Sequence, residues 1–295
     1  MDKKESVFIS AILYLSDYSN TPEKFIRNLL EGLKTYFIHC ELILVNDCCT
    51  KHEHLLKEVL PSLGDSTITV VHMSVKQGIE ACLKAGLDVS IGDFVFEFDT
   101  LESSFKKDLL WDVYQEALKG NDVVSVEPEQ NNFSRKLFYR LFNKCSNADY
   151  DIHASAFRLV SRRTINRVLE LKMSSAFRQA MYASCGLKNS RIEYKGSASL
   201  KKARGLSLAL DSFLLYTDIC KRVCMVSMFL LVSFFSTGIV GMCVNNFIWL
   251  FRLSVLLSVL LILCILVLLL YYARLILSET DIQYLISNIE KVQKG

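Results

Sequence analysis

Short apolar runs alternate with longer amphipathic stretches over roughly the first 200 residues of the chain. The short runs are rich in β-branched residues and are bounded by polar ones, which predicts β-strands over 7–15, 41–46, 68–72, 94–98 and 122–126. The longer stretches carry apolar residues at helical spacing and predict helices over 22–36, 53–60, 77–87 and 106–119. Strands that alternate with helices in this way are typical of an α/β fold, with a mostly parallel sheet and helices on both faces.

Two longer apolar stretches lie near the C-terminus. Neither Val223–Val244 nor Leu253–Ala273 contains a charged residue. A helix of about 20 residues rises about 30 Å, which matches the hydrocarbon core of a bilayer. A pair of buried core helices is the alternative, but such helices would need a large protein around them to cover every side. The pattern therefore predicts a transmembrane hairpin of two helices.

Basic residues lie on the two outer flanks of this hairpin. Asn245 and Asn246 belong to a short connection between the spans, so both flanks lie on one side of the membrane. The flanking basic residues are Lys201, Lys202, Arg204, Lys221, Arg222, Arg274, Lys291 and Lys294. The positive-inside rule then predicts a multi-pass membrane protein of two spans, with its α/β domain and both termini cytoplasmic. The early run Val7–Leu15 ends at Asp17 without a cleavage site, so we interpret it as a strand and not as a signal peptide.

Composition narrows the classes of partner. Hydrophobic residues make up 51% of the 295 residues, and their excess is concentrated in the two spans. The net charge of +3 comes without a basic stripe interleaved with aromatics, so no nucleic-acid partner is expected, and the charge suits an anionic membrane surface. The ten cysteines form no C-x-x-C pair, which indicates reduced thiols. Small residues in the first span, such as Gly238 and Gly241, permit helix contacts in a homo-oligomer.

Two aspartates directly follow predicted strands. Asp47 comes after the strand 41–46, and Asp99 after the strand 94–98. In open α/β sheets ligands bind beyond the carboxyl ends of the strands, so these carboxylates are candidate binding residues. The alternative for Asp47 is an Asx turn that closes the strand. For Asp93, which follows Gly92, a plain turn is an equal alternative.

Four segments in order resemble the family-two inverting glycosyltransferases of GT-A fold, in particular the dolichyl-phosphate mannose synthase and bactoprenyl (undecaprenyl-phosphate) glucosyltransferase group. ELILVNDCCT resembles the family's strand that ends in V-D-D-G-S. VKQGIEACLKAGLDVSIGDFVFEFD resembles its N-x-G-x-x-x-A-x-x-x-G followed by G-D and an acidic strand end. SAFRLVSRR resembles F-R-L-x-S-R, and the two spans resemble the anchor of the bactoprenyl branch. The resemblance covers nearly the whole chain.

This resemblance implies a GT-A-like, nucleotide-binding fold and four parts of the chain. Residues 1–205 would be a cytoplasmic GT-A-like glycosyltransferase domain and 206–222 an interfacial juxtamembrane helix. Residues 223–273 would be the two transmembrane helices and 274–295 a cytoplasmic tail. The implied partners are a nucleotide-sugar donor, a polyprenyl phosphate acceptor and the membrane.

The resemblance also implies roles for the acidic residues. Asp47 would bind the base or ribose of the nucleotide-sugar, and Asp93 and Asp99 would lie by the nucleotide and its diphosphate. The family's strand ends in D-x-D, whose two carboxylates hold a divalent cation, Mg²⁺ or Mn²⁺, against the leaving diphosphate. Here the triplet is Asp99-Thr100-Leu101, so the second carboxylate is missing. Asp99 with Glu97 or Glu102 would supply the metal ligands.

Arginines provide the candidate phosphate ligands. Arg158 and Ser161 stand three apart, on one face if the segment is helical, and Arg162 extends the cluster. The family uses this region near the donor diphosphate and the lipid phosphate, which makes Arg158, with Asp99, a candidate catalytic residue. On the helix expected over 135–144, Arg135 and Arg140 would face lipid headgroups. A solvated basic face is the alternative for Arg158, and for this helix the alternative is that Tyr139 and Phe142 only pack.

Two functions compete on this pattern. The first is an enzyme that moves a sugar from a nucleotide-sugar to a polyprenyl phosphate, with inversion, for cell-envelope glycan assembly. The second is a catalytically degenerate scaffold or binding subunit of a glycan-assembly complex, which the leucine at position 101 favours. The sequence does not favour a transporter, because the apolar segments of its two spans contain no charged residue.

Overall fold

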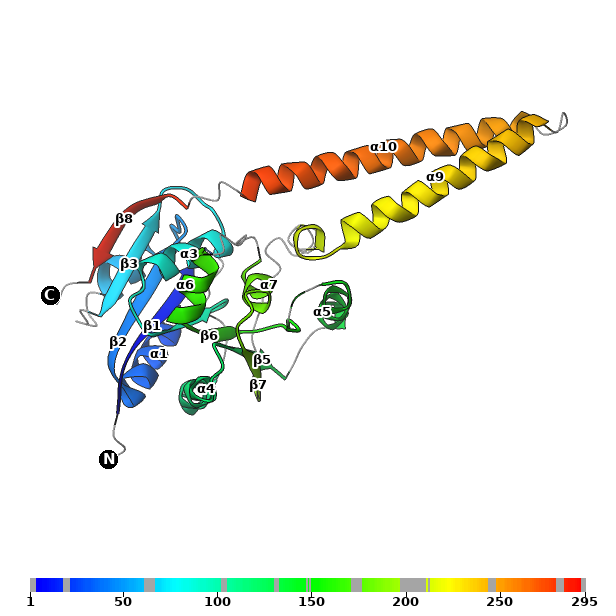
Figure 1. The fold of residues 1–295 in the computed structure, drawn as a ribbon. Helices are drawn as coiled ribbons and strands as arrows, with labels where there is room; N and C mark the ends of the chain where they lie inside the picture. The colour runs from blue at the N-terminus through cyan, green and yellow to red at the C-terminus, as the bar shows by residue number, and fades with distance from the viewer. Residues whose placement is uncertain are drawn as a thin grey trace.

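The computed structural model describes most of the chain. The described residues are 4–17, 22–60, 67–101, 105–129, 133–146, 148, 150–170, 177–196, 211, 213–243, 248–279 and 284–292. They form one eight-stranded sheet, helices on both of its faces and a long two-helix hairpin that projects from one end (Figure 1).

The sheet brings together strands from both ends of the chain. Its strands are β1 (Glu5–Leu15), β2 (Phe37–Asn46), β3 (Ile68–Met73), β4 (Phe94–Phe98), β5 (Val123–Pro128), β6 (Phe157–Ser161), β7 (Asn189–Tyr194) and β8 (Ile286–Lys291). Their order is β7-β5-β6-β4-β1-β2-β3-β8. Strands β1 to β4 are mutually parallel, β5 is parallel to β7, and β6 and β8 run antiparallel to their neighbours. The carboxyl ends of β1, β2, β3 and β4 therefore share one edge.

Alternating side chains of the strands build a core on each face of the sheet. Ile9 and Leu13 of β1 belong to a core shared with α1 (Pro22–Tyr36) and α4 (Asp108–Leu118). Ile12 belongs to a second core on the other face. That core includes residues of α3 (Ile79–Val89), α6 (Arg162–Glu170) and α7 (Arg178–Ala183). The predicted α/β fold, with a mostly parallel sheet covered on both faces, is confirmed.

Two predicted elements differ from the structure. The helix expected over 53–60 contains a π-helical segment, η1 (Leu55–Val59). Arg158 and Ser161 lie on strand β6, and the helix α6 begins only at Arg162. Because side chains three apart on a strand point to opposite faces, the expectation of one shared helical face is corrected. The juxtamembrane helix expected over 206–222 falls partly on 206–210 and 212, which lie outside the described residues.

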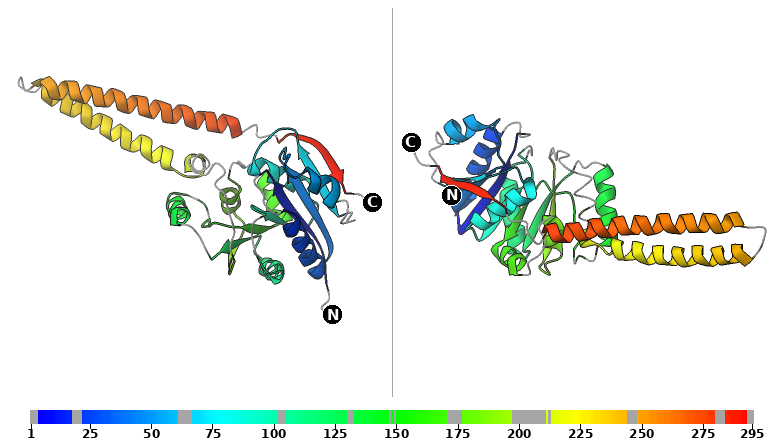
Figure 2. Two further views of the ribbon diagram at one scale, coloured as in Figure 1. Left: turned by 180° about the vertical axis from the view of Figure 1, so that it is seen from behind. Right: turned by 90° about the horizontal axis from the view of Figure 1, so that it is seen from above.

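The two C-terminal helices pack along each other and project from the α/β domain (Figure 2). Helices α9 (Ile219–Cys243) and α10 (Ile248–Glu279) contain apolar segments of 22 and 27 residues, with mean hydropathies of 2.2 and 3.4. Most of their large apolar side chains are exposed, and helices of this length and apolarity can cross a membrane. Small residues line their contact, since a Cβ at Gly238 would come within 2.7 Å of Ser254 Oγ. The hairpin is confirmed as a structure, and its placement in a membrane stays a prediction.

A further helix attaches the entry of the hairpin to the domain. The rings of Phe138 and Phe142 on α5 (Phe133–Cys145) lie 5.4 and 5.5 Å from the ring of Phe213. Ser146 forms a β-bridge with Thr217, just before α9. The start of α9 is therefore held against α5.

After the hairpin the chain returns to the sheet. Strand β8 pairs antiparallel with β3, and the side chain of Val292 reaches the core. Just before β8, Ser74 N donates to Leu285 O (2.8 Å), and Leu285 N donates to Gln77 Oε1 (2.8 Å). The segment 274–295, expected to be a tail, thus contributes the end of α10 and an edge strand. Both outer flanks of the hairpin are attached to the same domain.

Ending the chain after Glu279 is expected to destabilise the α/β domain while leaving both apolar helices complete. The truncation removes the β3–β8 hydrogen bonds, worth about 1 kcal/mol each, and the burial of Val292, worth about 1.5–3 kcal/mol. We expect the free energy of unfolding to fall by at least about 3 kcal/mol, and the amide of Ser74, which donates to Leu285 O, to exchange faster with deuterium. A chain that lacks only 293–295 is the control. Equal unfolding of the two truncated chains would show that β8 is not docked in solution.

Candidate active site

Asp47 lies at the carboxyl end of β2 and binds the loop that precedes α3. Gln77 N donates to Asp47 Oδ1 (2.8 Å), and Gly78 N donates to Oδ2 (3.0 Å). The Tyr14 hydroxyl also donates to Oδ2 (3.0 Å), and burial together with the neighbouring Asp47 raises the pKa of Tyr14. The carboxylate is buried under these contacts. Asp47 therefore fixes the loop at the carboxyl edge of the sheet.

The backbone around Asp47 is shaped by two neighbours. Asn46 makes the turn at the end of β2, because its Oδ1 accepts a hydrogen bond from Cys49 N (2.9 Å). Gly78 has a φ of 84°, a left-handed conformation that a side chain would disfavour, and this conformation accompanies the N–H bond to Asp47. Asp47 bonds Gln77 N and Gly78 N, 30 and 31 residues further along the chain, so the Asx-turn alternative does not explain its contacts.

Asp17, which the sequence analysis did not single out as a site residue, lies beyond the end of β1 at the same edge. Its Oδ1 accepts from Thr50 N (3.1 Å) and Lys51 N (3.3 Å), and its Oδ2 forms an ion pair with Lys76 Nζ (2.8 Å). The hydrogen bond from Lys76 is the main cause that lowers the pKa of Asp17. Asp17 ties the loop after β2 to the loop before α3.

Asp99 lies at the end of β4 in contact with two buried arginines. Arg158 Nη2 donates to Asp99 Oδ2, and Arg178 Nη2 donates to Asp99 Oδ1 (3.0 Å). The Asp99 side chain is 15% exposed, whereas each arginine side chain is 2% exposed. Both arginines also donate to Glu97 Oε2, Arg158 from 3.0 Å and Arg178 from 2.6 Å. Glu97 and Asp99 are two residues apart, so their side chains point the same way, and they share both partners.

Two further residues complete this buried cluster. Glu80 on α3 accepts from Arg178 Nε (2.7 Å), and the Tyr182 hydroxyl donates to Glu97 Oε1 (2.6 Å). Burial raises the pKa of Glu80 and that of Tyr182. Burial alone would lower the pKa of Arg178, but the carboxylates of Glu80, Glu97 and Asp99 outweigh it and raise the pKa. We call Glu80, Glu97, Asp99, Arg158, Arg178 and Tyr182 the ion-pair cluster.

The residues at Asp99 do not fit a divalent cation. Both Asp99 oxygens bind guanidinium groups, and Glu97 is fully buried with both of its oxygens engaged. Leu101 is buried in the hydrophobic core, and Glu102 lies outside the described residues. Among the described residues, no group of three His, Cys, Asp or Glu side chains is placed to hold a metal ion. These contacts do not favour the expected ligand pair of Asp99 with Glu97, and the pair of Asp99 with Glu102 stays a prediction.

Asp93 and Arg162 lie at the opposite edge of the sheet. Asp93 precedes β4, and its Oδ2 accepts from Phe8 N (3.1 Å) near the start of β1. Arg162 Nε and Nη2 donate to the carbonyl oxygen of Gly92 (3.0 and 2.8 Å), and Nη2 also donates to the carbonyl of Ser90 (2.9 Å). Both lie at the amino end of β4, so the structure does not bring the expected nucleotide ligand Asp93 or the expected phosphate ligand Arg162 beside Asp99.

Ser161 also lies at this amino edge. It pairs with Phe94 across β6 and β4, and its hydroxyl donates to Asp122 Oδ1 (2.9 Å). Its Oγ accepts from Thr164 N (3.2 Å), as an N-cap of α6 does. Ser161 therefore stabilises the start of α6. It lies at the edge of the sheet opposite Asp99.

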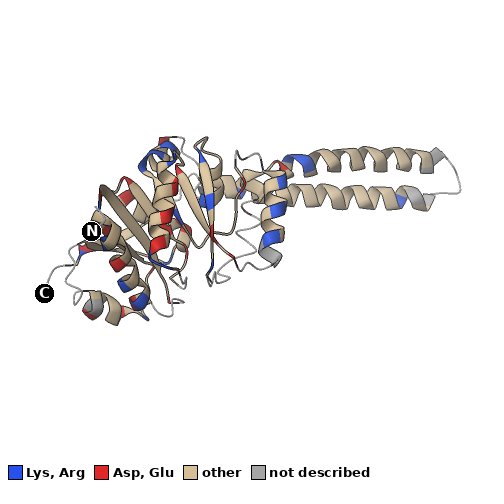
Figure 3. Cartoon of the chain, turned by 90° about the horizontal axis from the view of Figure 1, so that it is seen from below, with Lys and Arg blue, Asp and Glu red and all other residues tan. Residues whose placement is uncertain are grey.

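Helix α5 presents a basic and apolar face beside the entry of the hairpin. Lys136 and Arg140 are exposed one turn apart, next to the exposed Leu137 and Leu141. Arg135 lies on the first turn of the helix, and its side chain is outside the described part. In Figure 3, Lys and Arg positions (blue) gather on the helix at the base of the hairpin. The hairpin itself carries charged positions only near its ends. Arg135 and Arg140 lie on a separate element from the ion-pair cluster.

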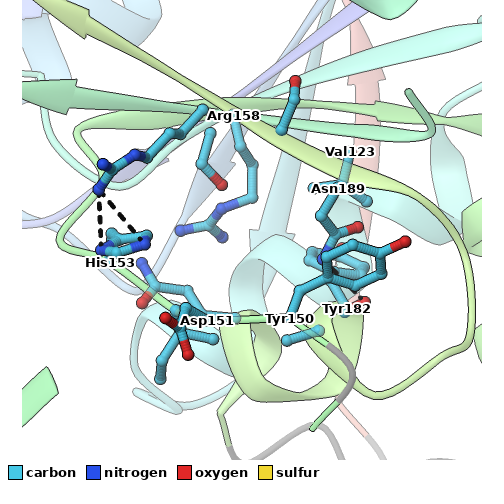
Figure 4. Close-up of a pocket in the computed structure, with 13 residues that line it drawn as sticks. Val123, Tyr150, Asp151, His153, Arg158, Tyr182 and Asn189 are labelled. Carbon is cyan, nitrogen blue, oxygen red and sulfur yellow. Dashed lines mark hydrogen bonds between the residues drawn. The ribbon is translucent and has the colours of Figure 1, made fainter. Parts of the chain in front are cut away.

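A cavity of about 210 Å³ adjoins Arg158 on the side away from Asp47. It is bounded by β5, β7, α7 and the segment 150–153 (Figure 4). Arg158 Nε faces it without a hydrogen-bond partner among the described residues, and so do Asn189 Oδ1 and Ser190 Oγ. His153 lies 3.5 Å from Arg191 at its rim, and burial, followed by the charge of Arg191, lowers the pKa of His153. Arg158 thus connects a polar cavity to Asp99.

No family model matches the chain. Curated relatives are similar over part of their length. An uncharacterised glycosyltransferase of Synechocystis is 23% identical over 195 residues, which cover 63% of this chain and 60% of the relative. A prophage bactoprenol glucosyl transferase homolog of Escherichia coli is 25% identical over 173 residues, 56% of this chain and 55% of the relative. The uncharacterised glycosyltransferase YkcC of Bacillus subtilis is 25% identical over 162 residues, covering 52% and 49%. The chain spans about half to 60% of the length of these relatives.

Solved structures share the fold. A mannosyltransferase from Pyrobaculum calidifontis, in complex with GDP-mannose and Mn²⁺, superposes with a TM-score of 0.53 at 13% identity, covering 72% of this chain and 63% of that one. Glucosyl-3-phosphoglycerate synthase of Mycobacterium tuberculosis gives a TM-score of 0.51 at 13% identity, covering 71% and 78%. The α/β domain therefore has the GT-A fold of glycosyltransferases. Among relatives by sequence, the chain is similar to proteins named as glycosyltransferases, one of them a bactoprenol glucosyl transferase homolog.

Half of the ion-pair cluster was not predicted from the sequence. Glu80 lies on α3, and Arg178 and Tyr182 lie on α7, where polar residues are ordinarily interpreted as solvated. Helix α7 is far from α3 and β4 in the chain. One signal was present: Glu97 interrupts an otherwise apolar strand, FVFEF, and a buried carboxylate requires a positive partner. That requirement predicts a basic partner, but not which residue supplies it.

Proposed function

We propose that this protein is a membrane-anchored glycosyltransferase that moves a sugar from a nucleotide-sugar to a polyprenyl phosphate, with inversion at the anomeric carbon. The observation that carries the proposal is the placement of Asp17, Asp47 and Asp99 at one carboxyl edge of a GT-A sheet. Ligands of open α/β sheets bind beyond this edge. A structure of the same fold holds GDP-mannose, which supports a nucleotide-sugar as the donor here.

In this proposal the parts of the nucleotide-sugar bind at different parts of the edge. Asp47 and the loop it holds would bind the base or ribose, and Asp99 with Arg158 would lie beside the diphosphate and the sugar. An ionised phosphate oxygen of the acceptor attacks the anomeric carbon as the bond from that carbon to the diphosphate oxygen breaks. The nucleoside diphosphate leaves with the electron pair. Because the phosphate nucleophile is already ionised, positioning and charge stabilisation supply the acceleration without a strong general base.

The hairpin and α5 support a lipid acceptor. Both flanks of the hairpin are attached to the α/β domain, so the domain is held close to the surface that the apolar helices would enter. The exposed Lys136 and Arg140 of α5 suit anionic headgroups and a lipid phosphate, and the exposed Leu137 and Leu141 suit the interface. By the positive-inside rule, the basic flanks favour a cytoplasmic location for this side. The bactoprenol glucosyl transferase homolog among the relatives agrees with a polyprenyl acceptor.

A transfer assay tests the proposal. Membranes that carry the protein are incubated with radiolabelled UDP- and GDP-sugars and a polyprenyl phosphate, and label is measured in the chloroform-extractable fraction. We expect label from one donor class, dependent on added polyprenyl phosphate. Membranes from cells without the protein are the control. Absence of lipid-linked label with every donor, from protein that is folded and membrane-bound, would reject the proposal.

The ion-pair cluster favours a second candidate, a degenerate binding subunit. Leu101 replaces a carboxylate, and Asp99 is already engaged by two arginines, as in a site where constraint on catalysis is relaxed. Such a protein would bind partners of a glycan-assembly complex without transferring sugar. Calorimetry with a panel of nucleotide-sugars separates the two candidates, since the degenerate subunit binds none of them.

A further inference from the structure

The guanidinium group of Arg178 is enclosed by three carboxylates. Its Nε lies 2.7 Å from Glu80 Oε2, its Nη1 2.6 Å from Glu97 Oε2, and its Nη2 3.0 Å from Asp99 Oδ1. These carboxylates come from α3 and β4, and Arg178 itself is the first residue of α7. Carboxylate oxygens are also the ligands that hard divalent cations prefer. Here a side-chain cation fills the space between them.

A metal ion at Asp99 would meet two fixed positive charges. Arg158 holds one Asp99 oxygen and Arg178 the other, and each arginine is also bound to the fully buried Glu97. A divalent cation bonds a carboxylate oxygen at about 2.0–2.6 Å, so an ion at Asp99 would lie within a few ångströms of both guanidinium groups. In a buried site such like-charge repulsion is weakly screened. Either the cation or Arg178 can occupy this place.

The arginines are not free to move aside. Both side chains are 2% exposed, and the Tyr182 hydroxyl also holds Glu97 from α7 (2.6 Å). To release Arg178 would leave the buried Glu97 carboxylate with fewer partners, which is strongly unfavourable. The leucine at position 101 packs into the core, so that position offers no ligand to draw a metal in.

We propose that Arg178 acts as the resident cation of this site, so that Asp99 binds no divalent metal ion and the nucleotide is bound without one. The guanidinium charge then stands beside the leaving diphosphate in the place that a metal ion takes in a D-x-D site. Only the identity of the bound ligand, a nucleotide, rests on the proposed function. The exclusion of a metal from Asp99 rests on the contacts of the cluster.

Direct metal binding tests this proposal. The full chain, in nanodiscs of zwitterionic lipid, is titrated with Mn²⁺, and free Mn²⁺ is measured by electron paramagnetic resonance, with and without UDP or GDP. We expect the wild type and Asp99→Asn to bind equal amounts of Mn²⁺ in both conditions. Arg178→Ala leaves the three carboxylates without their cation, and we expect it to bind Mn²⁺ at least about tenfold more tightly than the wild type. Arg191→Ala, an exposed arginine outside the cluster, is the matched control.

The outcomes separate this proposal from the proposed function. A Mn²⁺ ion that the wild type retains and Asp99→Asn loses would overturn the proposal, as would nucleotide binding that disappears in EDTA. Should Arg178→Ala fail to fold, the comparison of wild type with Asp99→Asn still decides the question. Equal Mn²⁺ binding in those two proteins, together with no nucleotide binding in EDTA or in Mn²⁺, would support the exclusion of metal from Asp99 and reject the glycosyltransferase function.

Discussion

Glu97→Ala is expected to lower the free energy of unfolding of the α/β domain by about 3–5 kcal/mol, the range typical for removal of one partner from a buried ion pair. Glu97 is fully buried and accepts hydrogen bonds from Arg158, Arg178 and Tyr182. Without it, two buried guanidinium groups share the remaining carboxylates of Asp99 and Glu80. The substitution also leaves the Tyr182 hydroxyl without its acceptor.

Trp111 provides the measurement. The chain has two tryptophans, and Trp111 stacks on Tyr36 in the α/β domain, whereas Trp249 lies in α10. In a Trp249→Phe background, urea unfolding followed by fluorescence therefore reports on the α/β domain alone. Glu23→Ala, which breaks an exposed ion pair with Arg27 (3.0 Å), is the control and should cost less than about 1 kcal/mol. A Glu97→Ala effect as small as that of the control would contradict the cluster.

The fold was predicted from the sequence because its signals are local. The strand 94–98 and the helix 22–36 have the predicted bounds, since each is an apolar pattern of one period flanked by breaking or capping residues. The strand β6 was missed as a strand because its five residues, FRLVS, contain a buried arginine that is interpreted as exposed in a sequence. Strand β8 was missed because ISNIEK is polar and short, and it exists as a strand only by pairing with β3.

The sequence predicted only those site residues that directly follow a strand. Asp47 and Asp99 follow strands, and the structure places both at the carboxyl edge. Asp93 precedes its strand by one residue, which already places it at the other edge. What the sequence did not contain is the partner of each carboxylate, because Arg178 is separated from Asp99 by 79 residues and meets it only through the packing of α7 on the sheet. The metal site was expected from a motif, whereas the charges that exclude a metal come from tertiary contacts.

These contacts change what a carboxylate at this edge does. In a D-x-D site the carboxylate recruits a cation from solution, so activity depends on free metal. In the ion-pair cluster the positive charge is covalently part of the chain and is fixed by Glu80 and Glu97. A preorganised charge of this kind needs no reorganisation when negative charge develops on a leaving group. The loss of a carboxylate at position 101 is then compatible with catalysis.

Asp99→Asn is expected to lower the rate of sugar transfer by at least about 100-fold, the effect typical of losing a donor that is aimed at developing negative charge. The carboxylate binds Arg158 and Arg178 through separate oxygens. An asparagine offers one acceptor oxygen, and its amide group would face the donors of the second arginine. The guanidinium groups would then shift from the positions they hold beside the diphosphate.

Asp93→Asn is the matched control for this prediction, because it makes the same chemical change six residues earlier at the opposite edge of the sheet. Asp93 is exposed, and its Oδ2 accepts a single hydrogen bond from Phe8 N, which an asparagine oxygen can also accept. Transfer by Asp93→Asn should therefore stay within about twofold of the wild type. Both variants are measured in the same membranes, over a range of donor concentrations and with urea unfolding as a check of folding. Equal loss of transfer in the two variants would place the reaction away from Asp99, whereas loss in Asp99→Asn alone, unrelieved by added Mn²⁺, ties the chemistry to the arginine-bound carboxylate.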